Sequence, residues 1–343
     1  MQLVRAALRG RPSVELNHLK EPSIQQGVTG ERTNRSLYWF AILLSCMTVG
    51  LLVAGALVTS NEAGDSVPDW PLSFGRWLIR SNNFIANVRY EYSHRFVAGV
   101  VGATTLIFAL WAYVSERRAW MRRLGLIALA GVIAQAGIGG LRVLLPEYKA
   151  AIAVPHALIA QSFFGLIMAM AVFTSSSWSE VREPRPDAGN PGLRRLATIA
   201  VVAVLIQLVL GAGFRHGAFG IIPHVSGAIV VTALIISTTL ITIRRHGGDK
   251  FLTRPAKLAT ALVMVQTGLG VAAYLARLAA AGDPQPLEPM ISLTVAHLVV
   301  GALTLASVLV LCLRSYRALS VQSLQTTDDV TPVEFRSPRR AAV

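Results

Sequence analysis

The amino-acid sequence predicts an all-α, polytopic membrane protein with eight transmembrane helices that form two pseudo-symmetric four-helix bundles. The first observation is composition, because 53% of the 343 residues are hydrophobic and only 15% are charged, whereas a soluble domain carries roughly 25% charged residues. The second is a series of eight apolar segments, each long enough to cross about 30 Å of hydrocarbon as a helix. The third is that motifs of the first four segments recur in the last four.

The distribution of basic residues favours a membrane protein and argues against nucleic acid as a partner. The net charge is +14, but most Lys and Arg residues lie in the two tails and in alternate short loops, without interleaved aromatic residues. By the positive-inside rule, this pattern predicts that both termini are cytoplasmic. We therefore expect the lipid bilayer as a partner and no nucleic acid. Glu residues within the Arg-rich N-terminal tail favour a bacterial plasma membrane over a mitochondrial inner membrane.

Polar stretches divide the chain into five predicted parts. A Ser- and Pro-rich stretch separates the fourth apolar segment from the fifth. The two cysteines, Cys46 and Cys312, lie inside apolar segments and predict no disulfide framework. We expect a cytoplasmic N-terminal tail at 1–36, an N-terminal four-helix half at 37–174, a cytoplasmic linker at 175–195, a C-terminal four-helix half at 196–313 and a cytoplasmic C-terminal tail at 314–343.

In the first half, helices are predicted near 37–60, 92–114, 121–144 and 152–174. A long polar loop at 62–75 follows the first helix on the outer side. The third helix carries Gln and Gly residues between Gln135 and Gly140, with Arg142 after them. The fourth begins at Pro155 and His156, since proline suits the first turn of a helix, where its missing N–H has no partner to lose.

In the second half, helices are predicted near 196–213, 221–243, 256–279 and 290–313. Each of them repeats a feature of its counterpart in the first half. The recurring residues are Gln207, Gly211 and Arg215 in the fifth helix, Pro223 and His224 in the sixth, Gln266, Gly270 and Arg277 in the seventh, and His297 in the eighth.

Histidines open the four even-numbered helices: His94, His156, His224 and His297. Because these helices all cross the membrane in the same direction, topology places the four imidazoles at similar depth near the outer face. A lone membrane histidine is commonly an interior hydrogen-bonding residue, whereas facing imidazoles in a helical bundle can bind a haem from both sides. Arginines at outer helix ends are candidates to pair with haem propionates, or else are snorkelling interfacial charges: Arg142, Arg215 and Arg277.

Glu91, His94 and Arg95 share one face of the second helix, at i, i+3 and i+4 spacing. Ionisable side chains at the mouth of a membrane helix indicate function, the alternative being a Glu91–Arg95 ion pair that only caps the helix. A di-iron site is disfavoured because no second Glu-x-x-His lies in an apolar segment, and zinc lacks a compact ligand motif. Since the second half has no such Glu, the first half is the candidate reactive half.

At these residues the sequence resembles the haem A synthase family over about residues 37–313. The resemblance implies a membrane oxidoreductase of haem biosynthesis, which oxidises the C8 methyl of haem O to the formyl group of haem A. The motifs that carry it are Gly55-Ala56-Leu57-Val58-Thr59 in the first helix, Pro68-Asp69-Trp70-Pro71 in the outer loop, Glu91, His94 and Arg95 in the second helix, and His156, His224 and His297 in the later even helices.

The resemblance also implies roles for individual residues and partners. Glu91 would be the catalytic carboxylate, and Arg95 would join the cofactor-binding residues. Haem O would be the substrate, handed over by a haem O synthase, with an unidentified electron acceptor, and a homo-oligomer stays open. The iron ligands would be His94 and His156 for haem O, and His224 and His297 for a haem b.

Two features depart from the family pattern or leave a choice open. Ser73 lies in the outer loop where many bacterial members carry a cysteine pair. The fifth and sixth helices are joined by so short a loop that His216 rivals His224 as a ligand. The strongest alternative function is a di-haem b-type cytochrome that exchanges electrons with quinone and leaves the haem unchanged. A transporter is a third class.

Overall fold

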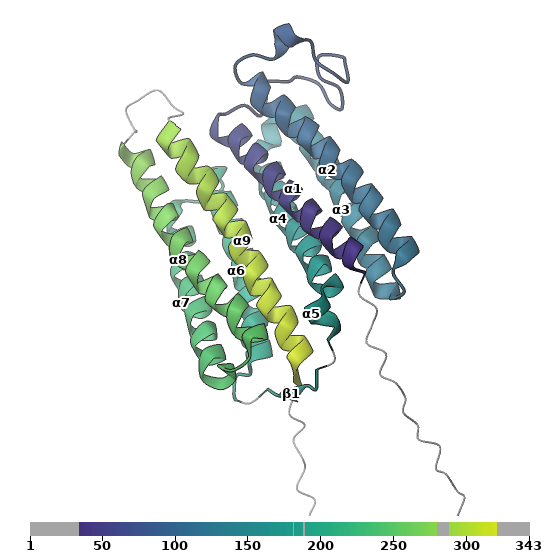
Figure 1. Ribbon diagram of the computed structural model, residues 1–343. Coiled ribbons are helices and arrows are strands. Elements are labelled where there is room, and N and C mark those ends of the chain that lie inside the picture. The colour runs from purple at the N-terminus through teal and green to yellow at the C-terminus, as the bar shows by residue number, and fades with distance from the viewer. Residues whose placement is uncertain (1–33, 181, 188, 280–287, 321–343) are drawn as a thin grey trace, which may run out of the picture.

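Long helices account for almost all of the architecture. The computed structural model describes residues 34–180, 182–187, 189–279 and 288–320. Within these residues, eight helices are long and apolar enough to cross a membrane, which confirms the predicted all-α, multi-pass membrane fold. The first four pack together (Figure 1) and are α1 (Arg35–Ser60), α2 (Val88–Ser115), α3 (Ala119–Leu144) and α4 (Lys149–Thr174).

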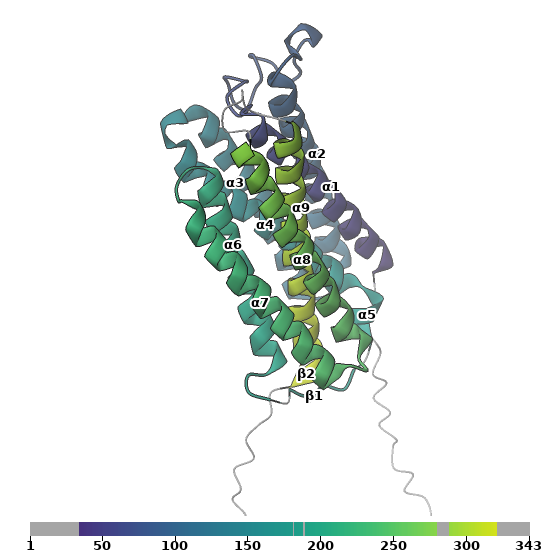
Figure 2. The same ribbon diagram turned by 90° about the vertical axis from the view of Figure 1, so that its left-hand side faces the viewer.

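The remaining long helices form a second bundle beside the first. Its contact with the first bundle is made by α1 and α4 on one side and by α6 and α9 on the other. Figures 1 and 2 show that α1 begins, and the described chain ends, at the same end of the molecule. The helices of this bundle are α6 (Leu193–Arg215), α7 (Ile221–His246), α8 (Lys250–Ala279) and α9 (Glu288–Ala318).

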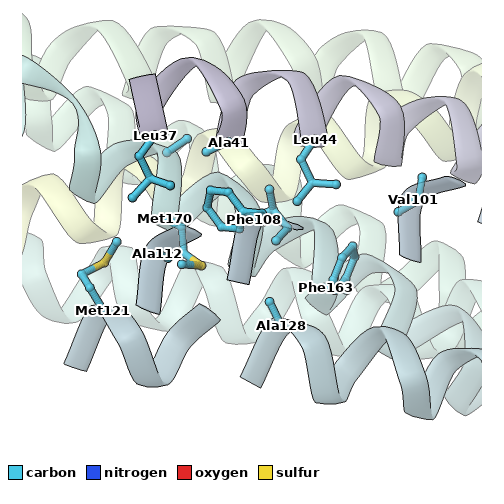
Figure 3. Packing of buried hydrophobic residues seen from close by; sticks show 12 residues of the cluster. Leu37, Ala41, Leu44, Val101, Phe108, Ala112, Met121, Ala128, Phe163 and Met170 are labelled. Atoms are coloured by element: carbon cyan, nitrogen blue, oxygen red, sulfur yellow. The ribbon is translucent and has the colours of Figure 1, made fainter. Parts of the chain in front are cut away.

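An apolar core fills the first bundle at the end where α1 begins (Figure 3). Phe108 of α2 is fully buried and its ring stacks on Phe40 of α1, with 5.9 Å between the ring centroids. Met121 of α3 and Met170 of α4 close the same cluster. Because lipid is as apolar as these side chains, close packing rather than the hydrophobic effect holds the helices together here. The opposite end of the bundle is left for polar residues.

The start of α4 differs from the prediction. The helix begins at Lys149, directly after a short 3₁₀ turn at Pro146–Tyr148, so Pro155 lies inside the helix and not in its first turn. The prediction was wrong because the first turn of α4 is polar and so lies outside the apolar pattern. Its first residue, Lys149, forms an ion pair with Asp65 of the outer loop. In the second half, Pro223 does lie in the first turn of α7, as predicted.

The segment between the bundles and the end of α9 also carry more structure than expected. The predicted linker contains the short helix α5 (Ser176–Ser179) and strand β1 (Arg185–Pro186), which pairs in parallel with β2 (Leu319–Ser320). Helix α9 continues to Ala318, past the predicted end near 313. The apolar pattern did not predict its last turns because they are polar. The predicted N-terminal tail up to residue 33, and the C-terminal tail beyond 320, lie outside the described residues.

Candidate functional site

Each of the four histidines that open even-numbered apolar segments lies against a glycine of the preceding long helix. A Cβ atom placed on any of these glycines would come within 3.3 Å of the imidazole Cε1 atom. At Gly211 and Gly270 the imidazole would have to move to admit a Cβ atom, and at Gly55 and Gly139 it would have to shift by a few tenths of an ångström. These glycines let the imidazole rings approach the helix backbone. The pairs and their distances are His94 on Gly55 at 3.1 Å, His156 on Gly139 at 3.3 Å, His224 on Gly211 at 2.9 Å and His297 on Gly270 at 2.9 Å.

A glutamine one turn before the glycine contacts the histidine in three of these four places. Gln135 Nε2 donates to the backbone oxygen of His156 at 2.8 Å. Gln207 Nε2 donates to the backbone oxygen of His224 at 2.8 Å and lies 2.9 Å from its Nδ1 atom. Gln266 belongs to the same pattern. From the sequence, these glutamines were recognised only as part of a repeat. Their Gln-x-x-x-Gly spacing is the signal that could have predicted their contact with the histidines.

The second-half pair has the geometry of two ligands to one metal. The ring centroids of His224 and His297 are 6.2 Å apart, and metal–imidazole bonds of about 2.0–2.1 Å put two rings on one metal at about this separation. His297 Nδ1 lies 3.1 Å from the backbone oxygen of Gln266, which only accepts, so this contact requires the proton on Nδ1 and leaves Nε2 as the basic nitrogen. The Gln266 amide, 3.2 Å from Nε2, would have to give way to a metal.

The first-half pair and Arg142 contain buried polar atoms that have no partner. The Nδ1 atom of His156 and the Nε atom of Arg142 are buried and make no hydrogen bond within the described residues. Arg142 is an electrostatic neighbour of both imidazoles. Unpaired buried donors and acceptors are costly and usually signify an absent partner. This set of nitrogen ligands and a guanidinium fits an iron porphyrin with anionic propionates.

The arginines at the outer helix ends have different surroundings. Arg215 crosses from the second bundle to α1, where its Nη2 donates to Ala56 O at 3.1 Å and to Ser60 Oγ at 2.7 Å. Arg277 lies over the ring of Phe214 at 5.3 Å, and Phe214 in turn stacks parallel to His224. Among the described residues, no carboxylate pairs with Arg142, Arg215 or Arg277. Each therefore keeps a positive charge that an anionic ligand can neutralise.

Glu91 and Arg95 form the ion pair that the sequence left open as the structural alternative. Glu91 is buried and Arg95 is partly buried, and the pair ties down the outer loop. Arg95 Nη2 donates to Glu91 Oε1 at 2.6 Å, and the Val67 N–H donates to Glu91 Oε2 at 2.9 Å. The Glu91 side chain is 5% exposed. Arg95 also donates to the backbone oxygens of Asp69, Leu72 and Val67. Predicted as a cofactor-binding residue, Arg95 thus directs its described bonds to the outer loop and to Glu91.

The outer loop also packs onto α3 through Trp70. A Cβ atom on Gly140 would lie 2.5 Å from the Trp70 indole, while the neighbouring Gly139 holds the imidazole of His156. Asp69 shapes the loop, since its carboxylate accepts the N–H groups of Phe74 and Gly75, both at 2.7 Å. Burial alone raises the pKa of Asp69, but these N–H bonds and Arg95 outweigh it and lower that pKa below its usual value.

His216, the rival ligand, lies at the end of α6 on the side of the first bundle. Burial, followed by the nearby charges of Arg142 and Arg215, lowers the pKa of His216 to about 4. His156 is another of its electrostatic neighbours. Among the described residues, the ring that contacts His297 is that of His224.

Known proteins are similar to this chain in sequence. The family profile described as "Cytochrome oxidase assembly protein" (COX15-CtaA) matches residues 38–223, more than half of the chain. The heme A synthase of Halalkalibacterium halodurans is 28% identical over 71% of this chain and 88% of its own length. That of Shouchella clausii is 23% identical over the same shares, and that of Lysinibacillus sphaericus is 32% identical over 53% of this chain and 59% of its own length. The chain therefore belongs to the COX15-CtaA family of cytochrome oxidase assembly proteins, as its motifs predicted.

Proposed function

We propose that this protein is a membrane oxidoreductase that converts haem O to haem A. The observation that carries the proposal is the set of four imidazoles, each held against a glycine and arranged as one pair in each bundle. The similarity to heme A synthases of bacterial relatives supports the same activity. The reaction turns a methyl substituent of the porphyrin into a formyl group, with oxygen supplied by water or dioxygen and with electrons and protons removed stepwise.

The first bundle is the proposed substrate site. His94 and His156 would hold the iron of haem O, and Arg142, which pairs with no carboxylate among the described residues, would bind a propionate. His224 and His297 would hold a haem b in the second bundle, with Arg277 and Arg215 near its edge. When bound, that haem would accept and pass on single electrons. The buried nitrogen atoms without partners in the first bundle support this assignment.

Glu91 is the proposed catalytic carboxylate. It follows from the spacing that Glu91 lies one turn from His94, on the same face of α2. Its two oxygens accept from Val67 and Arg95, and these bonds orient the carboxyl group. Such a group can take a proton from an attacking water or stabilise positive charge that develops at the methyl carbon. Trp70 and the rest of the 67–72 segment cover this end of the bundle and limit the entry of bulk water.

We further propose the orientation and the partners of the protein. Both termini would lie in the cytoplasm of a bacterial cell, as the distribution of basic residues predicts. The two histidine pairs would then lie near the outer face of the plasma membrane. Haem O would arrive from a haem O synthase, and the electrons would leave through an acceptor that contacts the second bundle.

Extracted-haem chromatography tests the proposed activity. The chain is expressed together with a source of haem O in a host that makes no haem A, and the haems are extracted and separated. We expect haem A in the extract, and we expect His94→Ala to abolish it while haem b is retained. A di-haem cytochrome that only carries electrons would yield haem b and unchanged haem O, and this result would overturn the proposal.

A further inference from the structure

The outer loop carries exposed apolar side chains in a segment whose charged residues are all basic. Between residues 70 and 90 the chain contains three arginines and no Asp or Glu. In the structure, the outer loop comprises residues 61–87, between α1 and α2. At its tip, residues 74–87, several large apolar side chains are exposed instead of being packed inside. They are Trp77 at 76% exposure, Leu78 at 70%, Ile85 at 63% and Phe84 at 47%. Apolar patches of this kind on a protein surface usually mark an interaction site.

The protein itself supports the base of this loop and not its tip. The base is held by the bonds of Arg95 to the backbone oxygens of residues 67–72 and by the Asp69 turn. Within the part of the chain that the structure describes, hydrogen bonds of residues 77–87 stay inside the tip or reach only the first turn of α2. The tip therefore needs a second surface to cover its apolar side chains.

The tip is continuous with the lipid-facing surface of the first bundle. The Phe84 ring lies edge-on to Tyr92 of α2, with 6.3 Å between the ring centroids. Phe84 also borders a mostly apolar cavity of about 250 Å³ between α1 and α2, which Ala54 and Leu57 line from the α1 side. Farther along α2, Phe96 is 57% exposed. Figure 1 shows the loop beyond the start of α2, on the side of the molecule away from α8 and α9.

We propose that the tip of the outer loop lies on the bilayer surface, on the side of the membrane opposite the described chain ends. Trp77, Leu78 and Ile85 enter the interfacial region, where aromatic and aliphatic side chains of amphipathic segments are commonly found. Arg76 and Arg80 contact the phosphate groups of anionic lipids. The continuity with α1 and α2 favours lipid over a protein partner as the occupant. This inference does not depend on the haem chemistry.

Nitroxide accessibility in lipid nanodiscs tests the proposal. The full-length protein, with Cys46→Ser and Cys312→Ser, is labelled at Leu78→Cys or Ile85→Cys, and at Asn82→Cys as a matched position in the same tip. Collision with oxygen and with a water-soluble nickel chelate is measured by power saturation. We expect labels at 78 and 85 to collide with oxygen and to be shielded from nickel, and the label at 82 to show the reverse. Equal nickel accessibility at all three positions would overturn the proposal.

The lipid charge and the arginines are tested in a second arm. The position of the Leu78→Cys label is compared between anionic discs of phosphatidylglycerol and neutral discs of phosphatidylcholine. The labelled double variant Arg76→Gln/Arg80→Gln is measured in the anionic discs. We expect the Leu78→Cys label to move toward water in neutral discs, and the double variant to reproduce that shift in anionic discs. An identical position in all three samples would overturn the role of the arginines. Shielding of the label from both oxygen and nickel would indicate a contact with a second copy of the protein and overturn the assignment to lipid.

Discussion

At the residue scale, the contact between a histidine and a glycine is the most demanding feature of the molecule. We expect Gly270→Ala to weaken haem binding in the second bundle by about tenfold or more, because over-packing typically costs about 1–3 kcal/mol and the new Cβ would lie 2.9 Å from His297. The haem content per protein, read from the reduced-minus-oxidised absorbance, measures this. Gly268→Ala is the matched control, since within the described chain its Cβ would meet no atom closer than 4 Å apart from its own stretch of helix backbone. Equal losses in the two variants would contradict the role of the contact.

Glu91 separates a catalytic role from a structural one. Glu91→Gln keeps an oxygen that can accept from Val67, so we expect the fold and both haems to persist. The yield of haem A should fall on the order of 10²–10⁴-fold, the range by which a general base accelerates a reaction, while haem O accumulates. The ratio of haem A to haem O in the extract measures the effect. Glu116→Gln, which alters a carboxylate paired with Arg118 at the other end of α2, should leave the ratio unchanged. A normal ratio in Glu91→Gln would leave that residue only its loop-binding role.

The candidate residues could be predicted to different degrees from the sequence. The histidines and Glu91 stood out because polar side chains in apolar segments are rare. The partners of Arg95 and Trp70 could not be predicted, because their contacts join segments whose relative position only the packed bundle defines. For the same reason, the hydrogen bonds of Arg215 to α1 could not be predicted; the sequence left it open as a propionate partner or a snorkelling charge.

At the element scale, the outer loop is held on α3 by one aromatic ring. We expect Gly140→Ala to displace Trp70, because its Cβ would lie 2.5 Å from the indole. Hydrogen exchange of residues 67–72 should then accelerate, and haem A formation should fall while haem b is retained. Gly137→Ala serves as the control, because among the described residues its Cβ would meet nothing within 4 Å outside its own stretch of helix backbone. Unchanged exchange in Gly140→Ala would mean that Trp70 does not anchor the loop.

The Asp69 turn makes the order of this loop depend on pH. The folded-state pKa of Asp69 lies below its ordinary value of 3.8, so its ionised form stabilises the turn. That contribution is present in full above the ordinary pKa and is lost as the pH falls through the lower folded-state value. After correction for intrinsic exchange, the amides of Phe74 and Gly75 should be protected above the ordinary pKa of 3.8 and should lose this protection as the pH is lowered progressively below it. In Asp69→Asn we expect weaker protection that no longer changes with pH; pH-independent protection in the natural chain would contradict this.

The helices themselves were largely predictable, and their ends were not. Apolar segments of membrane length specify the spans because backbone groups in lipid must be bonded within the helix. Polar first and last turns, as in α4, α8 and α9, extend into water and leave no such pattern. The pairing of β1 with β2 joins residues far apart in the sequence, so a two-residue strand could not have been recognised in advance.

At the scale of the whole molecule, the hydrogen bonds of Arg215 connect the two bundles. Because a hydrogen bond to a charged group contributes about 1.5–3 kcal/mol, we expect Arg215→Gln to lower the free energy of unfolding by about this amount. The thermal unfolding midpoint in detergent micelles measures the loss. Arg277→Gln is the control, since Arg277 lies over the ring of Phe214 and makes no bond to the other bundle among the residues that the structure describes. Equal midpoints for Arg215→Gln and the natural chain would show that the bundles are held together without it.

The pairing of Arg185 with Leu319 has a consequence for how such a molecule can arise. It places the entrance and the exit of the second bundle next to each other, on one side of the membrane. A unit of four spans always returns the chain to the side from which it started. Tandem duplication of such a unit therefore adds a second copy in the original orientation. Either copy can then lose its active residues without disturbing the membrane insertion of the other.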